Sequence, residues 1–145
     1  MLNNEPDQIR DILEGVRTIA LVGASEKTNR PSHEVMAYLQ NQGYRVIPVN
    51  PRLAGQQLLG ETVVADLNAL PEPVDMADLF LAPERTDPVI DQAIDLQIPV
   101  LWLQLGVINP AGAERAGNAG LKVVMDRCPK QEIPRLNIQT PRQTG

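Results

Sequence analysis

The sequence predicts an α/β fold in which a doubly wound parallel sheet of about five strands forms a single domain. Short apolar runs alternate along the chain with segments whose apolar residues recur at helical spacing, the pattern of strand–helix–strand units. The runs are continuous, which is typical of strands covered on both faces. The length of 145 residues suits one domain with a sizeable core. Right-handed crossovers then favour the strand order 3-2-1-4-5.

Five apolar runs are the expected strands. They cover Thr18–Val22, Tyr44–Val49, Met76–Leu81, Val100–Leu103 and Leu121–Met125. The stretch from Pro51 to Leu70 is expected to be irregular, with a short extended piece near Thr62–Val64. In a parallel sheet the loops that follow the strands meet at one edge, and ligands bind there.

Two helical patterns flank the first strand. The first helix is expected over Asp7–Glu14, because its apolar residues fall on one face. The second carries Val35, Met36 and Leu39 on one face and ends at Gly43. Together with the strands on either side, this second helix forms the first strand–helix–strand unit.

The second half of the chain carries clear helix-start signals. Asp87-Pro88 and Asn109-Pro110 each combine a capping side chain with a proline at the first helical position. A last helix is expected over Pro129–Leu136. The domain is therefore expected over residues 1–136, followed by a loose polar tail over residues 137–145.

Composition excludes several classes of function. The formal charge of −5 argues against generic binding of nucleic acid or of an acidic membrane surface. One cysteine excludes an intrachain disulfide and a cysteine-based metal cluster, and no metal site is expected. The first residues lack the features of a signal peptide, and no apolar run approaches membrane-spanning length, so a cytoplasmic protein is expected.

The turn after the first strand is the first candidate for a ligand site. Gly23-Ala24-Ser25 follows a buried strand and precedes a helix, a context in which backbone N–H groups and the helix dipole favour a phosphate. Only one glycine is present, so the turn is not a full dinucleotide fingerprint, and a plain tight connection is the alternative. The glycine-lysine phosphate motif of NTPases is absent, which argues against ATP or GTP hydrolysis.

The end of the second strand departs from an NAD site. An NAD site places an Asp or Glu there for the ribose hydroxyls, whereas this chain has Asn50, Pro51 and Arg52. A cation at that place suits a phosphorylated ribose. Lys27 and Arg30 also stand out as loop cations in an acidic chain and are second candidates for the same phosphate.

Four segments occur in order along the chain: Gly23-Ala24-Ser25, Gly43–Pro51 (GYRVIPVNP), Trp102–Gly106 (WLQLG) and Met125–Lys130 (MDRCPK). Together they resemble the stand-alone CoA-binding proteins, which are similar to the N-terminal domain of the succinyl-CoA synthetase alpha subunit. The resemblance covers roughly Ile9 to Leu136. It implies a Rossmann-like fold that holds coenzyme A at the strand ends.

The resemblance also implies a position for each part of coenzyme A. Residues Gly23, Ala24 and Ser25 would meet the pyrophosphate. The adenosine and its phosphate would lie near Asn50, Pro51 and Arg52. The third loop, with Leu81, Ala82 and Pro83, would line the remainder of the site.

Two residues are candidates for the thiol end of the cofactor. Gln104 follows the fourth strand, across the expected switch point from Gly23. Cys128 follows the fifth strand between Arg127 and Lys130, neighbours that are typical of a reactive cysteine, although a small buried hydrophobe is the commoner role. A mixed disulfide between Cys128 and the cofactor thiol is one possible outcome.

Three functions remain open at this point. The first is binding of free CoA or of an acyl-CoA, with a protein partner possible. The second is an NAD(P)-binding regulatory module, and the third is a thioester-handling enzyme subunit that needs a partner. The synthetase uses a phosphorylated histidine in a second domain, but His33, the only histidine here, falls in the first turn of a helix, so ligase activity is not transferred.

Overall fold

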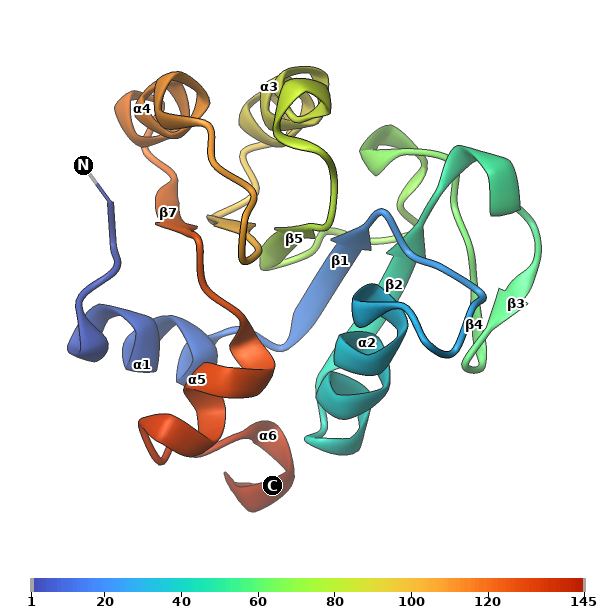
Figure 1. The fold of residues 1–145 in the computed structure, drawn as a ribbon, viewed down its shortest axis with the longest axis horizontal. Helices are drawn as coiled ribbons and strands as arrows, with labels where there is room; N and C mark the ends of the chain where they lie inside the picture. Colours follow the sequence, from blue (N-terminus) through green and yellow to red (C-terminus); the bar gives the residue numbers. More distant parts are fainter. Residues whose placement is uncertain (1, 145) are drawn as a thin grey trace.

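The computed structural model describes residues 2–144, in which a five-stranded parallel sheet lies between two layers of helices (Figure 1). The strand order is β2-β1-β5-β6-β7. The strands are β1 (Thr18–Val22), β2 (Arg45–Val49), β5 (Met76–Leu79), β6 (Val100–Leu103) and β7 (Lys122–Met125). They match the five expected apolar runs, and four of the five are buried along most of their length, as continuous apolar runs predict.

The helices divide between the two faces of the sheet. One face is covered by α1 (Pro6–Gly15), α2 (Pro31–Asn41) and α5 (Pro129–Arg135), which share a core cluster with Leu21 and Trp102. The other face is covered by α3 (Asp87–Asp95) and α4 (Pro110–Asn118). Helices on both faces make the sheet doubly wound, as the sequence predicts.

The predicted strand order was wrong. The third strand, β5, pairs with β1 and not with β2, which gives order 2-1-3-4-5 when only these five strands are counted. Two contacts account for it. The outer edge of β2 is occupied by a bridge from Val64 to Val49, and the Asp75 carboxylate accepts N–H bonds from Arg17 and Thr18 at the start of β1 (2.8 and 3.1 Å). The switch point therefore lies between β1 and β5.

The connection from β2 to β5 is more structured than the sequence indicates. It contains the 3-10 turns η1 (Pro51–Leu53) and η2 (Leu67–Ala69) and a two-stranded antiparallel hairpin of β3 (Gln57–Leu58) and β4 (Glu61–Thr62). The bridging residue Val64 lies at the end of the segment expected to be extended. The connection thus runs along the β2 edge before it crosses to the far side of β1.

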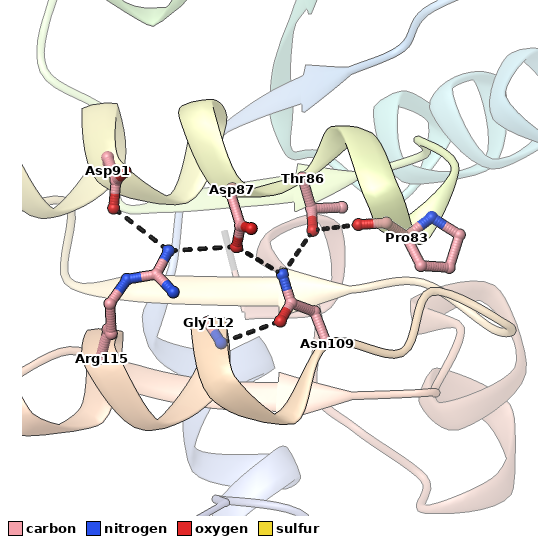
Figure 2. A network of polar contacts seen from close by, with 7 residues as sticks. All are labelled: Pro83, Thr86, Asp87, Asp91, Asn109, Gly112 and Arg115. Carbon is pink, nitrogen blue, oxygen red and sulfur yellow. Dashed lines mark hydrogen bonds and ion pairs between the residues drawn. The ribbon is translucent and has the colours of Figure 1, made fainter.

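A polar network holds the helices α3 and α4 together (Figure 2). Asn109 caps α4 by accepting the Gly112 N–H, while its amide donates to Thr86 Oγ1 and Asp87 Oδ1, each at 2.8 Å. Arg115 bridges Asp87 and Asp91. The Asn109 hydrogen bond, with the Arg115 guanidinium beside it, lowers the pKa of Asp87. The network fixes the start of α3 relative to the loop that follows β6.

The segment expected to be a loose tail is docked as far as the structure describes it. Ile138 and Thr140 are buried, and a short helix, α6, covers Pro141–Thr144. The Gln139 N–H donates to Glu14, and the Arg142 N–H donates to the carbonyl of Gln42. The sequence did not predict that this segment packs against the domain, because its few buried residues do not recur at helical or strand spacing.

Candidate functional site

A cleft of about 1320 Å³ opens at the carboxyl edge of the sheet. Its walls come from the loops after β1, β2, β5 and β6, together with the starts of α2 and α5 and part of α3. The cleft straddles the switch point between β1 and β5, which is where ligands bind in doubly wound folds. All the expected site residues line it except Pro83. They are Gly23, Ala24, Ser25, Lys27, Arg30, Asn50, Pro51, Arg52, Leu81, Ala82, Gln104 and Cys128.

Gly23 is required by the chain itself. Its φ is +92°, and a Cβ there would overlap the carbonyl oxygen of Phe80, the residue that follows β5. Only glycine therefore fits where β1 leaves the sheet beside β5. The glycine is explained without a ligand, so it does not by itself indicate a phosphate site.

The backbone N–H groups of the turn that are free to bind a ligand begin at Ser25, not at Gly23. The N–H groups of Gly23 and Ala24 both donate to the carbonyl oxygen of Val49, at 2.9 and 3.3 Å. The N–H groups of Ser25 and Glu26 make no hydrogen bond within residues 2–144. These two groups, beside the start of α2, are the ones open to an anion.

Asn50 ties the first two loops together. Its amide nitrogen donates to the Ala24 carbonyl at 2.8 Å, and its side-chain oxygen accepts the Arg52 N–H at 2.9 Å. Both ends of the amide are therefore engaged in holding the cleft wall. Pro51 and Arg52 begin η1 and are exposed on that wall.

Positive charge gathers at the cleft although the chain as a whole carries −5. The cations that line the cleft are Lys27, Arg30, Arg52, Arg85 and Lys130, against the carboxylates Glu26, Glu34 and Asp66. All five cations are exposed, and none of them forms an ion pair within the described part of the chain. Unpaired cations around a concave site favour a ligand with several negative charges.

Asp66 is a site residue that sequence reasoning missed. The Val64–Val49 bridge brings the segment around Asp66 beside the end of β2, and Asp66 lines the cleft there. Its carboxylate already accepts the Ala69 N–H at 3.1 Å. No local signal marks this position, because only the long-range bridge brings Asp66 beside the end of β2.

The loop after β5 supplies an apolar stretch of the wall. Phe80, Leu81 and Ala82 line the cleft, whereas Pro83 begins the short turn η3 (Pro83–Arg85). The Pro83 carbonyl accepts the hydroxyl of Thr86 at 2.7 Å, within the network of Figure 2. Pro83 therefore anchors the loop, and its neighbours face the cleft.

Gln104 and Cys128 line the cleft from the segments that follow β6 and β7. Cys128 is 6% exposed, precedes α5 and belongs to the core cluster as well as to the cleft wall. Its neighbour Arg127 turns toward the backbone, because its guanidinium donates to the carbonyl of Asp126. Lys130 lines the cleft. The structure is thus compatible with both roles considered for Cys128.

His33 lies away from the cleft wall. It is not among the residues that line the cleft, and its N–H donates to the carbonyl of Arg30 in the first turn of α2. Among residues 2–144 no cluster of three His, Cys, Asp or Glu side chains is placed to hold a metal ion. None of the helices that the structure describes is long and apolar enough to cross a membrane.

The family model of the CoA binding domain matches residues 17–134, which cover every strand of the sheet and every residue of the cleft. The chain belongs to this family. The chain is 33% identical to the uncharacterized protein YneT of Bacillus subtilis (strain 168) over 130 residues, which are 90% of this chain and 95% of that protein.

Solved structures agree with this membership. A Thermus thermophilus protein is 41% identical with a TM-score of 0.87, over 91% of this chain and 98% of that one. A hypothetical protein from Pyrococcus horikoshii OT3 is 37% identical, also with a TM-score of 0.87, over 92% of each chain. A dinucleotide forming acetyl-coenzyme A synthetase from Ca. Korarchaeum cryptofilum shares the fold at 20% identity and a TM-score of 0.66, over 80% of this chain and 27% of that one.

Proposed function

We propose that the cleft binds coenzyme A, extended along the carboxyl edge of the sheet from β2 to β6. The observation that carries the proposal is the division of one cleft into two regions. Three of the five exposed, unpaired cations, Lys27, Arg30 and Arg52, lie in the first two loops. The apolar residues Phe80, Leu81 and Ala82 of the loop after β5 line the wall that leads from there toward Gln104. Coenzyme A has the same division, with its phosphates at one end and a thin pantetheine arm at the other.

The phosphates are assigned to the side of β1 and β2. The Ser25 and Glu26 N–H groups, with Lys27 and Arg30 nearby, suit the pyrophosphate, since charge-assisted bonds to backbone N–H groups are strong. Arg52 suits the 3′-phosphate of the adenosine, which would lie against the part of the wall that Asn50, Pro51 and Asp66 form.

The pantetheine arm is assigned to the remaining wall. It would pass Leu81 and Ala82 and end at Gln104 and Cys128. The path from β2 to β6 crosses three strand spacings, about 14 Å, which an extended pantetheine arm and pyrophosphate can cover. The apolar wall also suits an acyl thioester, so an acyl-CoA remains within the proposal.

Calorimetry with CoA, NAD and NADP tests the proposal directly. CoA is expected to bind with micromolar or better affinity and NAD more weakly. Native mass spectrometry of the freshly purified protein gives a second readout, in which a copurifying CoA or acyl-CoA mass is expected. Equal or tighter binding of NAD would refute the assignment.

A second candidate is an NAD(P)-binding regulatory module. Asp66 favours it, because a carboxylate does reach the cleft beside the end of β2. The occupied N–H groups of Gly23 and Ala24 weigh against it, since a dinucleotide turn uses its first backbone donors for the pyrophosphate. The third candidate is a thioester-handling enzyme subunit, for which Cys128 is the one thiol among the described residues of the cleft wall.

A further inference from the structure

Three buried oxygen atoms lack a hydrogen-bond partner in the part of the chain that the structure describes. Two are the carboxyl oxygens of Asp78, which is fully buried in the middle of the sheet. The third is Oε1 of Gln104, a residue of the cleft wall whose exposed fraction is only 7%. Buried polar groups are nearly always paired, so these three atoms together require an explanation.

The two side chains share one face of the sheet. Asp78 on β5 pairs in register with Trp102 on β6, and Gln104 lies two residues beyond Trp102. The Gln104 N–H donates to the Leu79 carbonyl at 3.3 Å and so continues the parallel pairing. Residues two apart point to the same face, and diagonal neighbours on adjacent strands lie about 7–8 Å apart, within reach of long side chains.

All three atoms are acceptors if Asp78 is ionised, and no arrangement of acceptors alone satisfies them. A proton on Asp78 changes this, because a carboxylic acid has one O–H donor. Burial raises the pKa of Asp78 well above its ordinary value, and no charged group contributes to the shift. Asp78 lies among Leu21, Met76 and Trp102, where a lone carboxylate would be costly.

The other end of the Gln104 amide is free. Its Nε2 makes no hydrogen bond within residues 2–144, yet it is not among the fully buried unpartnered atoms. Gln104 borders the cleft, so solvent reaches this nitrogen from that side. The amide therefore directs its oxygen toward the protein interior and its N–H groups toward the cleft.

We infer that Asp78 is a positioning residue: as a neutral acid it donates to Oε1 of Gln104 and so holds the Gln104 N–H groups in the cleft as donors to a carbonyl oxygen of the ligand. The inference rests on the proposed function, which brings the pantetheine arm to Gln104. The carbonyl belongs to a pantetheine amide or, in an acyl-CoA, to the thioester. An ionised Asp78 would instead attract the N–H groups and leave the amide oxygen in the cleft.

Binding measurements on three variants test the inference: Asp78→Leu, Asp78→Asn and Gln104→Leu. Each is titrated with CoA, acetyl-CoA and adenosine 3′,5′-bisphosphate, which lacks the pantetheine arm. Asp78→Leu and Gln104→Leu are each expected to weaken CoA about three- to tenfold, the loss of one neutral hydrogen bond. Asp78→Asn keeps a donor and is expected to retain the affinity. Adenosine 3′,5′-bisphosphate is expected to bind all variants equally.

The double variant separates positioning from general damage. Asp78→Leu combined with Gln104→Leu is expected to bind CoA no more weakly than Gln104→Leu alone, since Asp78 acts only through Gln104. Additive losses in the double variant would overturn the inference, as would single-variant losses that are as large for adenosine 3′,5′-bisphosphate as for CoA. A larger loss for acetyl-CoA than for CoA would assign the carbonyl to the thioester, and equal losses would assign it to a pantetheine amide.

Two further results keep the outcomes distinct. If the wild-type protein binds neither CoA nor adenosine 3′,5′-bisphosphate, that result refutes the proposed function. The protonation of Asp78 is then tested by the spectroscopy that follows. Infrared difference spectroscopy reads the proton without any ligand and without the leucine variants. The wild type is expected to show the carbonyl band of a protonated acid at neutral pH that Asp78→Asn lacks, and its absence would overturn the inference.

Discussion

Replacing Asp78 by asparagine is expected to change how stability depends on pH. Asp78 is fully buried, and burial alone raises its pKa well above the ordinary value of 3.8. The folded state therefore keeps a proton that the unfolded state releases. The stability that this proton provides is fully present below about pH 3.8 and is lost as pH rises toward the folded pKa. An asparagine side chain has the same shape and does not titrate.

The size of the effect follows from linkage. Each pH unit between the unfolded and folded pKa values costs the wild type about 1.4 kcal/mol of unfolding free energy. Over two pH units inside that window, the Asp78→Asn variant is therefore expected to gain about 3 kcal/mol relative to the wild type. For a domain of this size that difference corresponds to roughly 8 °C in Tm.

Urea unfolding at a series of pH values from about 4.5 upward, between the unfolded and folded pKa values of Asp78, measures this difference directly. Only the slope of the difference with pH matters, so a constant loss or gain from the new amide does not affect the result. Asp95→Asn is the matched control, because Asp95 is exposed and the same change there alters charge without burial. If the wild type and Asp78→Asn lose or gain stability in parallel across the pH range, Asp78 is not a buried neutral acid and the reasoning is wrong.

Three further predictions concern the cleft. Arg52→Ala is expected to weaken the binding of CoA about fivefold at low ionic strength and that of dephospho-CoA hardly at all, because an exposed side chain contributes a modest charge interaction. Arg45→Ala, outside the cleft, is the control. Equal losses for CoA and dephospho-CoA would exclude Arg52 from binding the 3′-phosphate. Gly23→Ala is expected to lower the unfolding free energy, measured by calorimetry without any ligand, by at least about 2 kcal/mol, because the Cβ of the alanine would overlap the Phe80 carbonyl. An unchanged Tm would contradict this prediction. With CoA disulfide, the Cys128 thiolate is expected to attack one sulfur, form a Cys128–CoA disulfide and release CoA thiolate. Mass spectrometry of the intact protein should then show a CoA-sized gain in mass that Cys128→Ser lacks. If the mass does not rise although thiol titration shows that Cys128 is accessible, Cys128 is a structural residue.

The elements of this fold could be read from local pattern, whereas their order could not. Continuous apolar runs and proline-led helix starts are local signals, and they predicted the five strands and the main helices. The position of β5 depends on Val64 closing the β2 edge and on Asp75 binding the start of β1, and neither contact has a local signature. Strand order is a long-range property, so a pattern that fits several orders predicts none of them reliably.

The candidate site shows the same limit in its details. Loop positions at the strand ends predicted most of the cleft wall, because every parallel strand delivers its following loop to the same edge. The engagement of the Gly23 and Ala24 N–H groups by the Val49 carbonyl could not be foreseen, since it depends on how two loops meet. Asp66 arrives through the same kind of contact.

The switch point also divides the cleft between two halves of the chain. The loops up to Leu67 supply the wall on the β1 and β2 side, and residues from Phe80 onward supply the rest. A ligand that spans the cleft therefore links two segments that meet in the sheet only along the β1–β5 pairing. A ligand bound in the cleft therefore stabilises the contact between the two segments. At about one hundred times its Kd, such a ligand adds about 2.7 kcal/mol to the unfolding free energy. Under the proposed function, the unfolding free energy of the chain is therefore expected to rise with the concentration of free CoA.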